Sequence, residues 1–235
     1  MATGVLYLIP TVIADGTHEQ VLAPHVRQVL PSIQYFLAEE LRTARRFLSA
    51  LKTFPSIEAL HFETLNKDTP DSAVPALIQP LLNGHNMGVL SESGCPGVAD
   101  PGSKVVALAH QKNIRVVPLV GPSSILLALM ASGLNGQQFC FHGYLPIDSK
   151  ELTIRIKDLE RESKSRKQTQ IFIETPFRNQ NLLEQLTKTL QPETLLSVAY
   201  SLTSPNESIH TKKVSQWRHE QRTLAKEPAV FLFLA

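Results

Sequence analysis

The residues best suited to contact a ligand lie in the segment SESGCPGVADPGSK, from Ser91 to Lys104. It contains three glycines and two prolines, follows an apolar strand-like run, and precedes a helix-like one. Glycine lets the backbone approach a ligand closely, and proline holds a turn in place. Loops at the carboxyl ends of parallel strands are where open α/β sheets bind ligands. The segment therefore predicts either a ligand-binding loop or a tight strand-to-helix turn without a ligand.

Two known nucleotide motifs fit this chain poorly. Residues 97–104, GVADPGSK, nearly match the phosphate loop GxxxxGK[ST], but Ser103 and Lys104 stand in transposed order. No GxGxxG opens a helix, so a triphosphatase and a nicotinamide-binding site are both disfavoured. A second turn, Gly121–Pro122 before Ser123 and Ser124, predicts a helix start whose amides face an anion, or a plain N-cap.

Charged side chains near the predicted strand ends are candidates for acid–base chemistry. Glu40 and Arg42 follow a strand expected over 32–38. They are either groups that contact a substrate or charged residues at a helix start. His61 is either a base or a hydrogen-bonded side chain at the end of a strand. Asp100 is expected to cap or brace the DPG turn, and a direct catalytic role is the less favoured alternative.

Composition indicates an ordinary globular protein, with 43% hydrophobic and 19% charged residues. The formal net charge of +2 neither indicates nor excludes a nucleic-acid partner. The basic segment Lys164–Lys167 either touches RNA phosphates or belongs to a solvated helix face, because acidic residues interleave with the basic ones before it.

The two cysteines, Cys95 and Cys140, form no CxxC or Cys/His cluster, so neither a metal site nor a disulfide framework is expected. Cys95 is disfavoured as a nucleophile because the sequence places no catalytic histidine with it. No signal peptide is expected, and the most apolar stretch is broken by Pro118 and Gly121, which argues against a membrane span. A cytoplasmic protein is expected.

Periodicity divides the chain into two α/β parts. Strand-like runs over 5–10 and 32–38, and near Leu60, Val89 and Val116, alternate with helical patterns, which predicts a mostly parallel sheet with crossover helices. After Gly121 comes a helix that ends on Gly133. Five more strand-like runs follow, with helices only near 150–163 and 177–190, which predicts a mixed sheet. We place the domains at 1–118 and 119–235.

The run from Gly88 to Pro146 resembles the core of the tetrapyrrole-methylase superfamily, in the branch of the ribosomal RNA small-subunit methyltransferases I. That branch reads SDAGTPxxxDPG, a helix, GIRVVPLPGPSA, a second helix and RFxFxGFLP. This chain reads SESGCPGVADPG, NIRVVPLVGPSS and QQFCFHGYLP at the same places. Weaker matches at LYLIPTVIADG, AEELRTARRFL, LHFETLNK and IFIETPFR extend the resemblance over essentially the whole chain.

The resemblance implies a methyltransferase that binds S-adenosylmethionine in a cleft between its two domains and usually forms a homodimer. Its acceptor would be a ribose 2′-hydroxyl of ribosomal RNA, with the small ribosomal subunit as a partner. Methyl transfer from a sulfonium requires alignment of the reacting groups and no metal. The cofactor-binding positions that it implies are Pro10, Gly94, Cys95, Val98, Ser123, Ser124, Leu145 and Ala229.

Departures from the family pattern fall in the segments that we assign to the acceptor. The opening TPIGNL becomes TVIADG, and the acid of AEDTR becomes Glu40. The segment LHxHNE keeps only its first histidine, His61. The catalytic candidates are therefore Glu40, Arg42 and His61. Two alternatives stay open: a methyltransferase acting on a tetrapyrrole or other small acceptor, and a protein that binds S-adenosylmethionine without catalysis.

Overall fold

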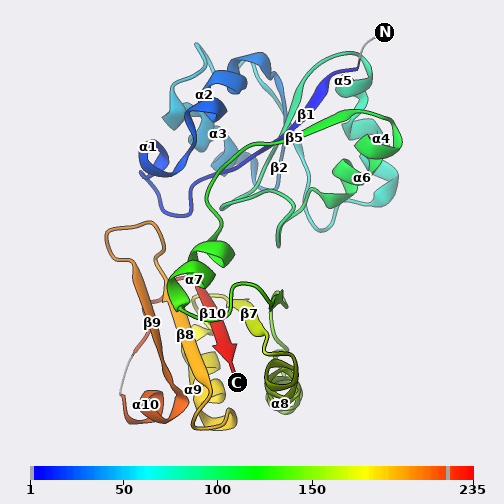
Figure 1. Ribbon diagram of the computed structural model, residues 1–235. Helices are drawn as coiled ribbons and strands as arrows, with labels where there is room; N and C mark the ends of the chain where they lie inside the picture. The colour runs from blue at the N-terminus through cyan, green and yellow to red at the C-terminus, as the bar shows by residue number, and fades with distance from the viewer. Residues whose placement is uncertain (1–2, 221–222) are drawn as a thin grey trace. The chain divides into compact units, whose positions relative to one another are not determined.

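The computed structural model describes residues 3–220 and 223–235, and it divides into two units, 1–123 and 124–235. Each unit is a five-stranded sheet with its own helices, which confirms the predicted pair of α/β sheets (Figure 1). The division falls between Ser123 and Ser124, just after the boundary that the sequence placed near Leu119.

The first unit contains a fully parallel sheet in the order β3-β2-β4-β1-β5. Its strands are β1 (Val5–Ile9), β2 (Tyr35–Ala38), β3 (His61–Thr64), β4 (Met87–Leu90) and β5 (Arg115–Pro118). The second strand is shorter than expected, because Ser32 belongs to the 3-10 turn η1 (Leu30–Ser32). All five carboxyl ends meet at one edge, and this edge positions the site described below.

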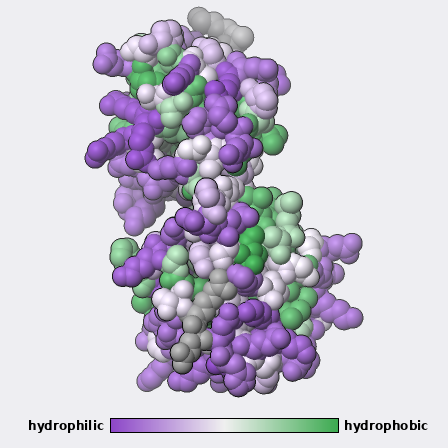
Figure 2. All heavy atoms as spheres, turned by 90° about the vertical axis from the view of Figure 1, so that its left-hand side faces the viewer, coloured by the Kyte–Doolittle hydropathy of each residue, from purple (hydrophilic) through white to green (hydrophobic). Residues whose placement is uncertain are grey.

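Helices cover both faces of this sheet. One group is α1 (His18–Val21), α2 (Pro24–Val29) and α3 (Leu41–Leu51), and the other is α4 (Val74–Leu77), α5 (Gln79–Leu82) and α6 (Ser103–Gln111), with the turn η2 (Asp71–Ala73) before α4 (Figure 1). The side that carries α1 to α3 faces the viewer in Figure 2, where hydrophilic residues predominate over the first unit.

Prolines shorten the helices that periodicity alone predicted as continuous. Pro24 begins α2, and Pro75 and Pro80 lie in the first turns of α4 and α5. Proline has no N–H to donate and clashes with the preceding turn, so a helix can begin at it but cannot run through it.

The second unit contains a mixed sheet in the order β6-β7-β10-β8-β9, as predicted. Only the β6–β7 pair is parallel among the pairs of the described residues. The strands are β6 (Phe139–Phe141), β7 (Thr169–Glu174), β8 (Leu195–Tyr200), β9 (Ser208–Lys213) and β10 (Ala229–Leu234). The helices are α7 (Ser124–Ser132), α8 (Ser149–Arg166), α9 (Asn179–Thr189) and α10 (Val214–His219).

The prediction of only two helices after Gly133 is wrong, because α10 is a third. Its sequence, VSQWRH, shows little helical periodicity. Trp217 is buried there and its Nε1 donates a hydrogen bond to the carbonyl of Leu196, 2.9 Å away. Tertiary burial of this one indole therefore stabilises a helix that local preference does not indicate.

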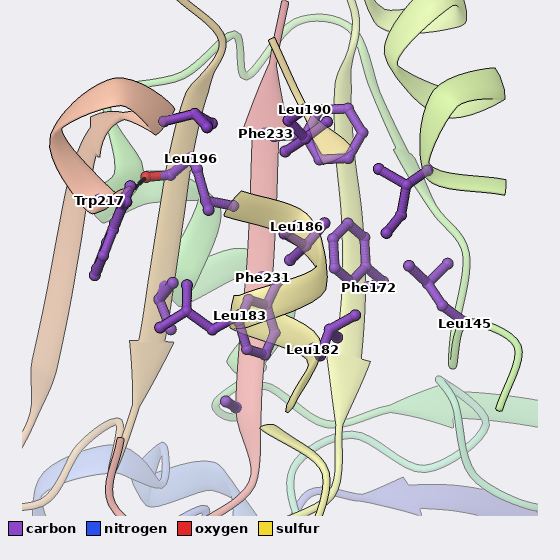
Figure 3. Close-up of a cluster of buried hydrophobic side chains, with 14 of the residues drawn as sticks. Leu145, Phe172, Leu182, Leu183, Leu186, Leu190, Leu196, Trp217, Phe231 and Phe233 are labelled. Atoms are coloured by element: carbon purple, nitrogen blue, oxygen red, sulfur yellow. Dashed lines mark hydrogen bonds between the residues drawn. The ribbon is translucent and has the colours of Figure 1, made fainter. Parts of the chain in front are cut away.

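Aromatic rings on β7 and β10 form the centre of the second core. Phe172 and Phe231 are register partners whose rings stack at 5.9 Å, and leucines of α9 pack against them, including Leu182 and Leu186 (Figure 3). This packing fixes β7 against β10, so that Glu174 at the end of β7 lies opposite Ala229. No helix of the described residues is long and apolar enough to cross a bilayer.

Candidate functional site

Three backbone segments meet at the carboxyl edge of the first sheet. They follow β1, β4 and β5, and they begin near Pro10, Ser91 and Gly121. The amide of Thr11 donates a hydrogen bond to the carbonyl of Gly94 (2.8 Å), and the hydroxyl of Ser91 donates to the same carbonyl (2.9 Å). We call the segment from Ser91 to Gly102 the glycine-rich loop. Its start is therefore held directly against the end of β1.

Glycine is required at two positions of this junction. A Cβ on Gly121 would lie 2.2 Å from the Cβ of Pro10, which no side chain can tolerate. Gly94 has a φ of +81°, and a Cβ there would meet the carbonyl of Pro122 at 3.3 Å. The thiol of Cys95 donates to that carbonyl at 3.3 Å. The junction is thus a close packing of backbone segments.

The rest of the loop has an unusual backbone conformation up to α6. Gly97, Ala99 and Gly102 have φ values of +78°, +61° and +139°. Gly102 is the N-cap of α6, and because glycine has no side chain it cannot supply a side-chain cap to this helix. Val98, midway along the loop, is 48% exposed, which leaves its side chain accessible to a ligand.

Carboxylates surround this loop. Burial raises the pKa of Asp100 from an ordinary 3.8 to about 6, with the nearby Glu39 and Glu92 acting in the same direction. Burial also raises the pKa of Glu39, Glu92 adds to this effect, and Lys67 opposes it. Glu39 and Glu92 were not among the residues predicted from the sequence. Their signal is position: each follows the carboxyl end of one of two adjacent parallel strands, β2 and β4.

Glu40 and Arg42 lie at the same edge, where α3 begins. Glu40 is the N-cap, and its carboxylate accepts a hydrogen bond from the backbone amide of Arg42 at 2.9 Å. The carboxylate therefore has a structural role at the helix start, which is one of the two interpretations that the sequence allowed. Glu40 and Arg42 both lie at this helix start.

His61 lies at the opposite edge of the sheet. It is the first residue of β3 and pairs in register with Tyr35, the first residue of β2, whose ring stacks on it at 4.8 Å. The length of β2, about 10 Å, separates this edge from the carboxyl edge, where Glu39 and Glu40 follow the strand. Tyr35, His61 and Met87 line a pocket of about 410 Å³ there, away from the glycine-rich loop. The fold does not bring His61 to Glu40 and Arg42.

The remaining cofactor candidates lie at the junction of the two units in the chain, in the loop after β6 and on β10. Ser124 is the first residue of α7 and directly follows Ser123, the last residue of the first unit. Leu145 and Ala229 are 3% and 2% exposed, so their side chains belong to the core and only their backbone can meet a ligand.

A buried ion pair holds the segment at Leu145. The carboxylate of Glu174 is fully buried, and its Oε2 lies 2.8 Å from Nη2 of Arg178, in a geometry outside that of a hydrogen bond. Its Oε1 accepts from the amide of Thr175 at 2.7 Å. The same Nη2 donates to the carbonyl of Leu145 at 3.4 Å. Glu174 and Arg178 therefore brace the loop after β6.

The described residues contain no cluster of three or more histidines, cysteines or acids arranged to hold a metal ion. The carboxyl edge of the first sheet carries backbone amides and carbonyls, the half-buried carboxyl group of Asp100 and the thiol of Cys95. Burial raises the pKa of that thiol, on Cys95, so the nucleophilic thiolate is disfavoured.

Comparison with known proteins identifies the family. The model of the Tetrapyrrole (Corrin/Porphyrin) Methylases matches residues 11–217. Ribosomal RNA small subunit methyltransferase I of Escherichia coli O157:H7 is 29% identical over 232 residues, which cover 97% of this chain and 77% of that protein. The protein of the same name from Synechocystis sp. is 30% identical over 205 residues, 87% of this chain and 69% of its own.

Solved structures agree in fold. The methyltransferase CobJ matches with a TM-score of 0.63 at 19% identity, over 99% of this chain and 94% of its own. Uroporphyrin-III-C-methyltransferase from Thermus thermophilus matches with a TM-score of 0.54 at 19% identity, over 98% and 92%. With the family model matching most of its length, the chain belongs to the tetrapyrrole methylases and is an S-adenosylmethionine-dependent methyltransferase.

Proposed function

We propose that this methyltransferase modifies a ribose 2′-hydroxyl of ribosomal RNA in the small ribosomal subunit. The observation that carries the proposal is the extent of the similarity to proteins named ribosomal RNA small subunit methyltransferase I. That similarity runs over 97% of the chain at 29% identity, so it includes the acceptor-side segments as well as the glycine-rich loop.

We propose that S-adenosylmethionine contacts Pro10, Gly94, Cys95, Val98 and Ser123 in the first unit, and Ser124, Leu145 and Ala229 in the second. The residues fit such a ligand because the middle of the glycine-rich loop is open: nothing lies within 4 Å of a Cβ placed on Gly97, and the side chain of Val98 is 48% exposed. When bound, the cofactor supplies an electrophilic methyl group whose sulfur departs as a neutral sulfide, so no acid is needed for the leaving group.

An alcohol acceptor must lose its proton, and we assign this step to Asp100. A general base works best when its pKa lies near the working pH, and the pKa of about 6 places Asp100 closer to neutrality than an ordinary aspartate. Arg42, at the start of α3, supplies positive charge at the same edge, and Glu40 orients that helix start. His61 is not part of this proposal because it lies at the opposite edge.

Transfer of a labelled methyl group to isolated small ribosomal subunits tests the proposal. The subunits come from a strain that lacks the homologous methyltransferase, and subunits from a strain that contains it serve as the already modified control. We expect label only in the unmodified subunits, and nuclease digestion followed by mass spectrometry should place it on a ribose. The variant Asp100→Asn should lower the rate strongly, whereas Asp68→Asn, at an exposed position, should not.

The same assay distinguishes the alternatives. Label in a tetrapyrrole such as uroporphyrinogen, and none in ribosomal subunits, would move the acceptor to a small molecule. Binding of S-adenosylmethionine in calorimetry without transfer to any acceptor would indicate a non-catalytic protein. The homodimer and the cytoplasmic location stay predictions, and light scattering of the purified protein tests the first of them.

A further inference from the structure

Helix α3 carries an unusual concentration of positive charge for this chain. Its sequence, LRTARRFLSAL, contains three arginines and no acidic residue, although the whole chain has a net charge of only +2. Arg42, Arg45 and Arg46 are spaced i, i+3 and i+4, which places them on one side of the helix. All three are exposed, and we call them the arginine face.

Packing of α3 fixes the direction of this face. Ala44, Leu48 and Leu51 are buried in the core beside Phe36 of β2, so the helix is anchored along one side. The arginine face lies on the side that the core leaves free. The helix begins directly after the carboxyl end of β2, so its first turn shares the edge at which Glu39 and the glycine-rich loop lie (Figure 1).

Local contacts leave the charge of two members of the arginine face, Arg45 and Arg46, largely unneutralised. The guanidinium of Arg45 lies over the ring of Phe62, 5.0 Å from its centroid, and this contact with a neutral ring leaves its positive charge unneutralised. Arg46 reaches Asp15 at 3.8 Å, but both side chains are exposed at 71% and 89%, so water screens this pair.

The other basic helix, α8, differs in this respect. Its Arg161 pairs with Asp158, and its Arg166 pairs with Glu162 at 3.3 Å. Arg155 contacts the ring of His142 at 3.2 Å. Acidic residues thus alternate with the basic ones along α8 and offset their charge, whereas α3 has none within it.

From these observations we propose that the arginine face binds the phosphodiester backbone of the RNA acceptor and holds it at the edge where methyl transfer occurs. Arginine suits this role because its planar fork of N–H donors matches two phosphate oxygens at once. The inference rests on the proposed function, because it takes RNA as the acceptor. It adds the surface that contacts the RNA, outside the positions assigned to the cofactor.

Salt-dependent binding tests the arginine face. The probes are a fluorescently labelled single-stranded RNA and purified small ribosomal subunits, titrated with the full chain between about 50 and 200 mM salt. The variant Arg45→Gln/Arg46→Gln is compared with Arg161→Gln/Arg166→Gln on α8, which removes the same charge. Loss of two phosphate contacts should lower the slope of log K against log salt by about 1.4 and weaken binding roughly tenfold or more.

A second variant separates charge from geometry. Arg45→Lys/Arg46→Lys should keep most of the salt slope but bind more weakly than the unmodified chain, because an ammonium cannot make the bidentate contact. All variants should bind S-adenosylmethionine with unchanged affinity in calorimetry, and this result also shows that they are folded.

The outcomes distinguish the two proposals. Suppose that the unmodified chain methylates ribosomal subunits and that the Arg45→Gln/Arg46→Gln variant matches it in RNA affinity and salt slope. The proposed RNA-binding role of the arginine face is then wrong, and the proposed function stands. An equal loss in the α8 variant would also overturn the inference, because the effect would then be general charge. If the unmodified chain binds S-adenosylmethionine but neither binds nor methylates RNA, the proposed function and this inference both fail.

Discussion

Gly121 packs against Pro10 so closely that a Cβ on Gly121 would lie 2.2 Å from the Cβ of the proline ring and 2.3 Å from its Cγ. The contact continues the pairing of β1 with β5, since the amide of Leu119 donates to the carbonyl of Leu8 at 2.9 Å just before it. Two backbone segments that are distant in sequence are thereby held together where the glycine-rich loop also arrives.

Replacement of Gly121 by alanine should disrupt this junction. We expect Gly121→Ala to destabilise the chain by about 1–3 kcal/mol, because the added methyl group must displace Pro10 or its own strand. The affinity for S-adenosylmethionine should fall as well. Urea unfolding and calorimetry measure the two effects. Gly136→Ala is the matched control, since nothing lies within 4 Å of a Cβ there. Equal behaviour of both variants would contradict the assigned packing.

Asp100 should make activity and stability depend on pH in opposite directions. Its carboxyl becomes protonated as the pH falls through about 6, so a base at this position predicts a rate that declines there. Because the folded state holds this proton more tightly than the unfolded state, the contribution of Asp100 to stability falls as the pH rises from about 4 to about 6.

The variant Asp100→Asn cannot ionise and should show neither dependence. Its rate should be lower than that of the unmodified chain by roughly a hundredfold or more at neutral pH. Its thermal stability relative to the unmodified chain should increase between pH 4 and 7. A variant with full activity would exclude Asp100 as the base, and an unchanged difference in stability would contradict its raised pKa.

Cys95 should react slowly with alkylating reagents. Burial raises the pKa of its thiol, and the thiol donates to the carbonyl of Pro122, so little thiolate is present at neutral pH. We expect iodoacetamide to modify Cys95 more slowly than a free cysteine, as followed by mass spectrometry of the digested protein. Because Cys95 is assigned to the cofactor and not to the reacting groups, Cys95→Ser should affect the KM for S-adenosylmethionine more than kcat. Loss of kcat at saturating cofactor would reinstate the thiol as a reacting group.

Removing one partner of the buried ion pair between Glu174 and Arg178 should lower the free energy of unfolding substantially. Arg178→Met leaves the buried carboxylate without its cation, and we expect a loss of about 3 kcal/mol in urea unfolding. The double variant Glu174→Gln/Arg178→Met should recover part of this loss. Arg166→Met, which breaks a more exposed pair with Glu162, should cost about 1 kcal/mol or less. If Arg178→Met lowers stability as little as Arg166→Met does, the buried ion pair does not contribute the expected stabilisation.

Much of the fold was predictable because its signals are local. Short apolar runs separated by helical patterns predicted the parallel sheet of the first unit, and a change in rhythm after Gly121 predicted the mixed sheet of the second. The glycines and prolines around Gly94 and Gly121 predicted turns between strands and helices by residue type alone. Each of these signals depends on what a residue can or cannot do in its own stretch of chain.

The tertiary structure decided which side chains meet. Strand order places β2 next to β4, so Glu39, Glu92 and Asp100 gather at one edge although they are far apart in sequence. The same parallel arrangement puts the start of β3, and with it His61, at the other edge. Burial of Trp217 likewise makes α10 a helix. Such relationships depend on distances through space and on burial, and neither is encoded in the spacing of residues along the chain.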